Sequence, residues 1–158
     1  MLDKIISGGQ SGADRAGWRA AKTFGLSSGG WMPTGFLTED GPHPEIAGQY
    51  GAAELPTDSA IDQTEQNVQA SDATLWFGAT TTVGAQETVG ACHRFTKPCM
   101  LIYPGASFEP WHVATWIAEN KIRTLNVAGS REQEQPGIGD RVERFLGAVL
   151  QQLGHERA

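Results

Sequence analysis

The sequence predicts an α/β domain in which a mostly parallel sheet carries helices on both faces. Two observations lead to this fold class. Short apolar runs recur along the chain, and stretches whose apolar residues have helical spacing lie between them. Strands that alternate with helices of this length imply βαβ units and a parallel sheet.

The first unit lies at the start of the chain. Residues 2–6 form an apolar run that ends at glycines, which is typical of a buried parallel strand. In residues 13–24 small apolar residues fall on one helical face, and Gly25 follows as a stop. A second strand is expected in residues 26–30. Residues 33–56 show no clear period, so we expect a long loop there.

The rest of the chain continues the alternation. Ser59 and Asp62 resemble the start of a capping box, and Pro110 suits the first residue of a helix. The expected elements are helix 59–70, strand 73–77, helix 85–95, strand 99–103, helix 110–119, strand 124–127 and helix 138–153. Together they predict one Rossmann-like three-layer domain over residues 1–158, without an internal repeat or linker.

Composition excludes several classes of function. The formal net charge of −6 and the pI near 5.1 argue against a nucleic-acid-binding surface, which needs a basic face. No apolar stretch approaches the length of a membrane span, so no membrane partner is expected. Two cysteines are too few for a disulfide scaffold, which favours a cytoplasmic location.

The loop between the first strand and the first helix is the main candidate for ligand binding. Its glycines permit a tight turn, and backbone N–H groups at a helix start can cradle an oxyanion. The spacing matches neither the dinucleotide fingerprint nor a P-loop, and a plain structural turn is the alternative. The candidate residues are Gly8, Gly9, Gln10, Ser11, Gly12, Ala13 and Asp14. Asp14 does not suit a phosphate, so it caps the helix, pairs with Arg15 or contacts another part of the ligand.

A second loop, residues 78–84, occupies the same kind of strand–helix junction. Its candidate residues are Thr80, Thr81, Thr82 and Gly84. Their hydroxyls suit polar ligand oxygens, whereas the alternative is that Thr81 or Thr82 caps its own helix.

Other residues give weaker indications. Thr64 and Asn67 share one helical face, which is either part of the site or simply solvated. Glu39 and Asp40 could act as acid or base if their loop folds over the site. The histidines and cysteines show no metal-ligand spacing, so we expect no protein-bound metal.

Several segments resemble the molybdenum cofactor carrier family. These are SGGQSGADRA, GGWMPTGFLTEDGP, QTEQNV with SDATL, KPCMLI, LNVAGSRE and PGIGDRV, spread in order from Ile5 to about Leu150. The wider Rossmann-like group includes lysine decarboxylase-like phosphoribohydrolases and nucleotide-ligand sensors. The resemblance implies an often oligomeric protein that binds molybdenum cofactor or a nucleotide-like ligand. It places the loop 8–14, the junction at Gly84 and Asn67 around the ligand.

The sequence departs from these relatives at two places. The loop after Pro33 is neutral where the family usually has basic residues, and Val83-Gly84 stands where two glycines are typical. The phosphoribohydrolase relatives carry the motif P-G-G-x-G-T-x-x-E. When its G-T pair is aligned with Gly84-Ala85, Thr88 falls at the position of the motif's glutamate. Glu87 is one residue away, about 100° round a helix.

We therefore predict binding of a small anionic ligand, with molybdenum cofactor or a nucleotide-derived molecule as the candidates. The role would be that of a carrier or sensor. The alternative is N-glycosidic hydrolysis of nucleoside monophosphates, ranked lower because the glutamate motif is not intact, so we assign no catalytic residue. Molybdoenzymes as recipients and a homo-oligomer are further expectations, with residues 108–116 as a contact surface.

Overall fold

The central sheet has five parallel strands. The computed structural model describes residues 1–158. The strands are β1 (Lys4–Ile6), β2 (Ser27–Gly29), β7 (Ala73–Phe77), β8 (Cys99–Ile102) and β9 (Thr124–Gly129). They lie in the order β2-β1-β9-β7-β8, and each neighbouring pair is parallel. The last strand of the chain is thus the central strand of the sheet.

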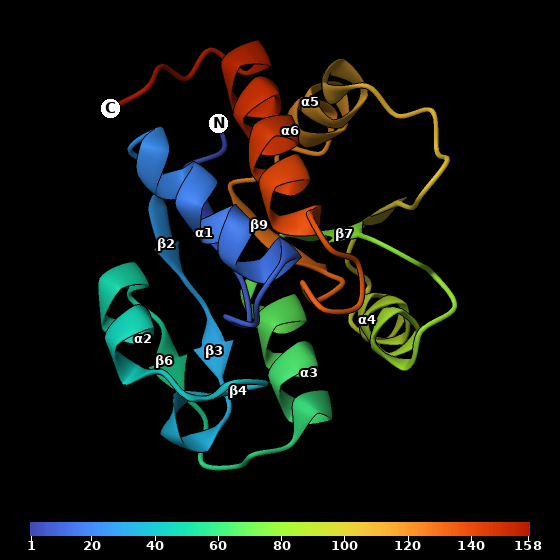
Figure 1. Cartoon of the computed structure of the whole chain (residues 1–158). Helices are drawn as coiled ribbons and strands as arrows, with labels where there is room; N and C mark the ends of the chain where they lie inside the picture. Colours follow the sequence, from blue (N-terminus) through green and yellow to red (C-terminus); the bar gives the residue numbers. More distant parts are fainter.

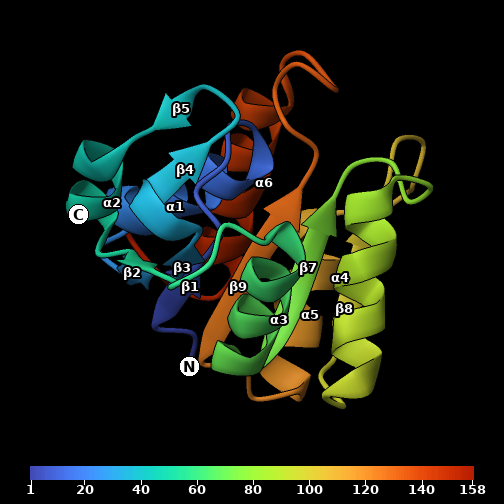
Figure 2. The ribbon, with the colours of Figure 1, turned by 90° about the horizontal axis from the view of Figure 1, so that it is seen from below.

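Helices cover both faces of this sheet. α1 (Ala13–Thr23), α5 (Pro110–Glu119) and α6 (Ile138–Gln152) lie on one face, and α3 (Ala60–Ala70) and α4 (Val83–Arg94) lie on the other (Figures 1 and 2). This arrangement confirms the predicted three-layer α/β fold. The predicted strands and helices outside residues 31–56 are all present, and their ends differ from the predicted ones by only a few residues. None of the helices combines the length and apolar character needed to span a bilayer.

The main core lies between the sheet and the layer of α1, α5 and α6. The small-residue face of α1 is buried, and a Cβ added to Gly17 would come within 2.9 Å of Val127 Cβ on β9. Glycine at this position therefore lets α1 lie directly on the central strand. The apolar stripe of α6 is buried against the same core, through Ile138, Val142, Leu146, Val149 and Leu150.

The long loop predicted for residues 33–56 is wrong. The segment from Trp31 onward contains the short strands β3 (Trp31–Met32), β4 (Leu37–Thr38), β5 (Gly41–Pro42) and β6 (Ala53–Glu54), the 3-10 turn Thr34–Phe36 and the helix α2 (Pro44–Tyr50). β4 and β5 pair as an antiparallel hairpin. This part packs through a separate cluster.

Trp18 of α1 is the centre of that cluster. It is fully buried against Met32 and Ala47, and its ring stacks on Tyr50 with the ring centroids 5.0 Å apart. Its indole N–H donates to the carbonyl of Gly29 at 2.7 Å. Because these contacts join residues distant in sequence, no local hydrophobic period reveals them.

Two predicted helix starts show side-chain capping. The Ser59 hydroxyl accepts a hydrogen bond from the Asp62 N–H at the start of α3, and the Thr82 hydroxyl accepts one from the Ala85 N–H at the start of α4. Pro110 is the first residue of α5, as predicted. The three helices therefore begin where local sequence fixes them.

Candidate functional site

A polar cleft of about 470 Å³ opens beyond the carboxyl ends of β7 and β9. β9 leads into α6 on one face of the sheet, whereas β7 leads into α4 on the other. This divergence is the topological switch point at which open α/β sheets bind ligands. Only 4 of the 19 lining residues are hydrophobic, so the cleft suits a polar ligand.

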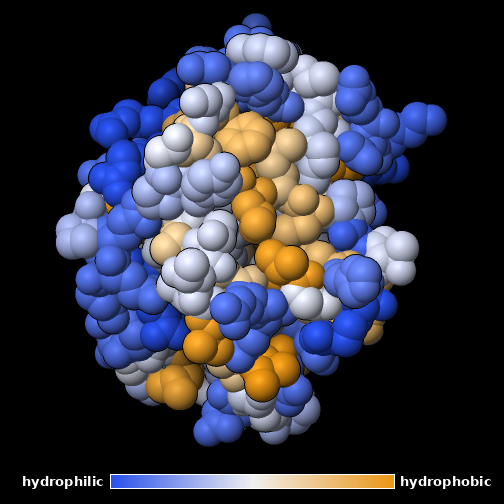
Figure 3. Space-filling view, turned by 90° about the vertical axis from the view of Figure 1, so that its right-hand side faces the viewer, coloured by the Kyte–Doolittle hydropathy of each residue, from blue (hydrophilic) through white to orange (hydrophobic).

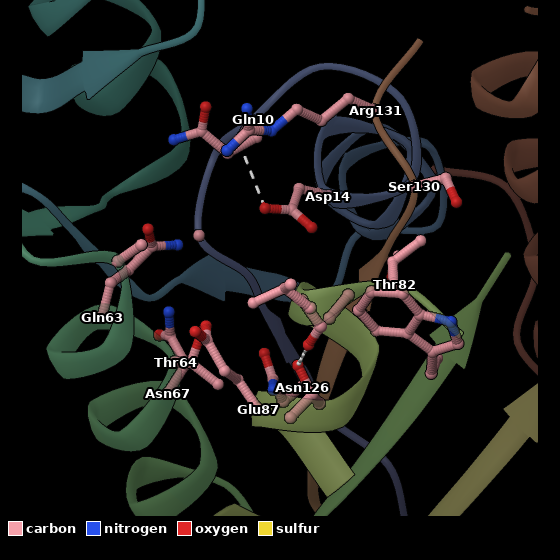
Figure 4. Close-up of a pocket in the computed structure, with 18 of the residues that line it drawn as sticks. Gln10, Asp14, Gln63, Thr64, Asn67, Thr82, Glu87, Asn126, Ser130 and Arg131 are labelled. Atoms are coloured by element: carbon pink, nitrogen blue, oxygen red, sulfur yellow. Dashed lines mark hydrogen bonds between the residues drawn. The ribbon is translucent and has the colours of Figure 1, made fainter. Parts of the chain in front are cut away.

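The cleft is surrounded by four segments (Figure 4). They are the glycine loop with the first turn of α1, the helix α3, the start of α4, and the stretch from Asn126 to Glu134 that includes the end of β9. Of the residues predicted for the site, those that line the cleft are Gly8, Gln10, Asp14, Asn67, Thr82 and Gly84. Those that do not line it are Gly9, Ser11, Gly12, Ala13, Thr80 and Thr81.

The N–H groups of the glycine loop are largely engaged within the protein. The Gln10 N–H donates to Asp14 Oδ2 at 3.2 Å, and the Ser11 N–H donates to Glu39 Oε1 at 2.7 Å. The Ala13 N–H donates to the carbonyl of Ser130 at 3.2 Å. Two carboxylates of the chain thus occupy the positions expected for an anionic ligand group.

Gly9 and Gly12 serve the geometry of this turn. Both have φ of 77°, which favours glycine. A Cβ on Gly9 would lie 2.7 Å from the Trp18 ring, and one on Gly12 would lie 2.5 Å from the Ser130 carbonyl oxygen. These two glycines therefore act in the local fold, whereas Gly8 faces the cleft.

The hairpin β4–β5 is fastened to the glycine loop by Gln10. The Gln10 side-chain amide donates to the Leu37 carbonyl at 3.2 Å and accepts from the Glu39 N–H at 3.1 Å. The Glu39 carboxylate then reaches Ser11, as described above. The segment that contains Glu39 thus does fold beside the cleft. Glu39 itself is not among the lining residues.

Asp14 is a buried acid at the edge of the cleft, with an exposed fraction of 7%. Burial raises the pKa of its carboxyl to about 7, against a smaller opposing effect of the Gln10 N–H. The negative charge of Glu39 raises the pKa further, and the positive charges of Arg131 and Arg15 lower it. Burial alone would also raise the pKa of Glu39, but the hydrogen bonds from Ser11 outweigh it and lower that pKa.

The threonine loop contributes mainly its last residue. Thr82 lines the cleft, and its hydroxyl also caps α4, so this residue has the helix-capping role that the sequence left open as an alternative to ligand binding. Thr88, one turn after Gly84 in α4, lines the cleft and donates its hydroxyl to the Gly84 carbonyl at 2.8 Å. Glu87 lines the cleft as well and takes part in no ion pair.

The helix α3 supplies a wall of neutral polar groups. Gln63, Thr64 and Asn67 line the cleft, whereas Glu65 pairs with Arg94 at 2.8 Å and does not line it. Asn67 is buried, and its amide exchanges two hydrogen bonds with the backbone of Trp31, at 2.8 and 3.0 Å. Its amide therefore attaches β3 to α3 from within the wall of the cleft.

The sequence reasoning missed the contribution of β9 and the residues after it. Asn126, Ser130, Arg131 and Glu134 all line the cleft. Asn126 has an exposed fraction of 3% on the central strand, and its side-chain N–H donates to the Thr74 hydroxyl at 3.1 Å. An asparagine inside an otherwise apolar strand was the available indication, because a buried amide needs partners.

Neutral polar side chains dominate the cleft, and among its charged side chains the acidic ones outnumber the basic one. Its charged lining residues are Asp14, Glu87, Glu134 and the single cation Arg131. No group of three or more His, Cys, Asp or Glu side chains is placed to hold a metal ion. Cys92 and Cys99 belong instead to a small apolar cluster between α3, α4 and β8.

A model of the circularly permutated YpsA SLOG family, cpYpsA, matches residues 5–150 of the chain. The chain belongs to this family. The strand order of this cpYpsA member is consistent with the circular permutation for which the family is named. If β9 and α6 are counted ahead of β1, the five strands read 3-2-1-4-5, which is the order of the first five strands of dinucleotide-binding domains.

A solved structure also resembles this cpYpsA member. It is the "Putative molybdenum carrier protein" of Syntrophus aciditrophicus SB, with 35% sequence identity and a TM-score of 0.85. The match covers 94% of this chain and 95% of that chain. These findings confirm the family resemblance inferred from the motifs. No curated protein matches the chain.

Proposed function

We propose that the chain binds a small ligand that has a polar heterocycle and an anionic group, in the cleft beyond β7 and β9. The observation that supports this most is the cleft itself, a polar hollow at the switch point of the sheet with the buried Asn126 in its lining. Most side chains that line the cleft are hydrogen-bond donors or acceptors, and few are apolar.

Arg131 is the group best suited to the anionic part of the ligand. It is the only cation that lines the cleft, and Ser130 beside it lines the cleft too (Figure 4). The first turn of α4, with Thr82 and Gly84, faces the same space and carries the positive end of the helix dipole. These groups together favour one phosphate-sized anion rather than a highly charged ligand.

Molybdenum cofactor is the first candidate ligand, as cargo that the protein carries. It is a pterin with a phosphate, so it has both parts that the cleft requires, and the similar structure from Syntrophus bears a molybdenum carrier name. A nucleotide-derived ligand has the same two parts. In this proposal the protein acts in the cytoplasm, and molybdoenzymes are the recipients.

A homo-oligomer forms part of the same proposal. β8 is an edge strand whose four residues are apolar or contain sulfur and are each half-buried. Tyr103, which follows it, and Trp111, in the first turn of α5, are exposed. Figure 3 shows apolar side chains gathered in a band on the corresponding side of the molecule. An edge strand without charged residues favours pairing with another copy. Analytical ultracentrifugation tests this, and a monomer at micromolar concentration would contradict it.

Two measurements test the binding function. Native mass spectrometry of freshly purified protein should show a bound mass, and denaturation should release a pterin or a nucleotide. Arg131→Ala should lower the bound fraction, because it removes the cation of the cleft. Arg144→Ala is the control, because Arg144 is exposed on α6 and does not line the cleft. An empty protein that gains no thermal stability from pterins or nucleotides would contradict the proposal.

Hydrolysis of an N-glycosidic bond is the second candidate function. The observation that favours it is that Glu87 lines the cleft together with the buried acid Asp14. Two carboxyl groups in different environments can divide the roles of acid and base. Incubation with AMP and GMP should then release the free base, and loss of this activity in Glu87→Gln would support the role of Glu87. Absence of base release from a broad nucleotide panel would rule it out.

A further inference from the structure

We infer that Glu87 and Asn126 form a subsite that accepts hydrogen bonds from a 2-amino-4-oxopyrimidine ring, the chemistry that guanine and pterins share. This inference rests on the proposed binding function and specifies the heterocycle. It begins from the acceptor groups that the chain leaves free in the cleft.

Asn126 presents an acceptor to the cleft. Its side-chain nitrogen is held by the Thr74 hydroxyl at 3.1 Å, on the neighbouring strand β7. This contact leaves the amide oxygen without a protein donor, although the residue is buried and lines the cleft. That oxygen is not one of the fully buried unpaired atoms of the chain, so it stays accessible from the cleft and can accept a hydrogen bond from a ligand N–H.

Glu87 presents a second acceptor from α4. It is half-buried, lines the cleft and has neither an ion pair nor a hydrogen bond from the protein. In Figure 4 its side chain points into the same end of the cleft as Asn126, with Thr64 of α3 in the same region. A carboxylate accepts two hydrogen bonds side by side and offers no donor when ionised.

This set of acceptors distinguishes between heterocycles. A 2-amino-4-oxopyrimidine ring presents an amino group and a ring N–H next to each other, so a carboxylate can accept from both. Adenine presents an unprotonated ring nitrogen beside its amino group, and the lone pair of that nitrogen would face the carboxylate. A site built on hydrogen bonds discriminates strongly against a ligand that leaves its polar groups unpaired.

The opposite end of the ligand would lie toward Arg131. Arg131 and Ser130 follow the end of β9, while Asn126 lies further back on the same strand. The ring and the anionic group therefore have separate partners. A free inorganic anion would meet only the Arg131 end and would leave the acceptors at Glu87 and Asn126 unused.

Isothermal titration calorimetry with four probes tests this subsite: GMP, AMP, pterin-6-carboxylate and inorganic phosphate. GMP, the pterin or both should bind at least about 10-fold more tightly than AMP and phosphate. Binding of GMP alone assigns the subsite to guanine nucleotides, and binding of the pterin alone assigns it to pterins. Equal affinity for AMP, or for phosphate, would overturn the inference while leaving ligand binding in place. Failure of all four probes to bind would overturn the binding function itself.

Glu87→Gln tests the residue assignment. It replaces one acceptor oxygen by a donor, so the affinity for the preferred ring should fall about 10- to 100-fold, with little change for AMP. Glu65→Gln on α3 is the matched control, since Glu65 does not line the cleft. The thermal unfolding temperature of both variants should stay within a few degrees of the wild type, because neither carboxylate is buried and the half-exposed Glu65–Arg94 pair contributes at most about 1 kcal/mol. An unchanged preference in Glu87→Gln would exclude Glu87 from the subsite.

Discussion

At the scale of single residues, Asp14 gives the clearest prediction of pH dependence. Its folded pKa of about 7 lies above the ordinary value of 3.8, so between these values the folded state binds more protons than the unfolded state. Its contribution to stability is fully present below pH 3.8 and is lost as the pH rises to about 7. Above that pH the contribution stays constant.

Asp14→Asn should remove this dependence, since an amide does not ionise. Between pH 5 and pH 6 the wild type should lose about 1.3 kcal/mol of unfolding free energy relative to the variant, and the loss per pH unit should fall by half as the pH reaches about 7. Urea unfolding at pH 5, 6, 7 and 8 measures the difference. Parallel profiles for the two proteins would mean that Asp14 is already ionised when buried.

Asn67 illustrates a residue whose structural role can be measured separately from ligand binding. Its amide makes two hydrogen bonds to the Trp31 backbone, so Asn67→Ala should lower the unfolding free energy by about 2 kcal/mol. Chemical denaturation of the protein without added ligand checks this value. A variant as stable as the wild type would assign the Asn67 amide to the ligand instead of the fold.

At the scale of elements, the glycine loop functions first as a turn. Gly9 and Gly35 both have positive φ, but a Cβ would crowd Trp18 and Met32 at Gly9 and would meet nothing within 4 Å at Gly35. Gly35→Ala should therefore cost only the backbone strain, about 1 kcal/mol. Gly9→Ala should cost an additional 1–3 kcal/mol or so through overpacking. Thermal denaturation of the two variants tests this, and equal losses would mean that Trp18 moves aside freely.

The hairpin β4–β5 depends on one side chain for its attachment. Gln10→Ala removes the contacts to the Leu37 carbonyl and the Glu39 N–H, so amides of residues 35–43 should exchange faster with solvent. Hydrogen–deuterium exchange measures this, and Gln86→Ala on the exposed side of α4 serves as the control. Unchanged protection would show that the Ser11–Glu39 contact alone holds the hairpin.

Some of these elements could be predicted from the sequence and others could not. Strand 73–77 was predictable because it is a continuous apolar run, and α6 because its apolar residues follow a helical period. The elements in residues 31–56 were not predictable, because they are held by contacts between Trp18, Met32 and Tyr50, which are far from one another in the sequence.

The candidate site divides in the same way. The two loops were recognisable by glycine and threonine at strand–helix junctions, and Gln10, Asp14 and Thr82 do line the cleft. Asn126 and Arg131 were missed, because their position depends on the last strand entering the centre of the sheet. Local sequence does not encode that insertion.

At the scale of the whole molecule, the order of the strands suggests that the present termini are not essential to the fold. The N–H of Ala158 donates to the Thr23 carbonyl at 2.8 Å, and the Ser27 N–H donates to the Asp3 carbonyl. Both ends of the chain thus lie next to the turn between α1 and β2, and Figure 1 shows them at the same end of the molecule.

A variant with its termini joined by a short glycine–serine linker and a new start at Lys121 should therefore fold. It would begin with β9 and α6, so that its strands follow the order 3-2-1-4-5 along the sheet. The new cut falls between Asn120 and Lys121, which are both exposed, and every packing contact of the core is retained. Since only loop closure changes, the unfolding temperature should stay within several degrees of the wild type. Circular dichroism melting measures it, and a variant without a cooperative transition would show that β1 must precede β9 for the sheet to form.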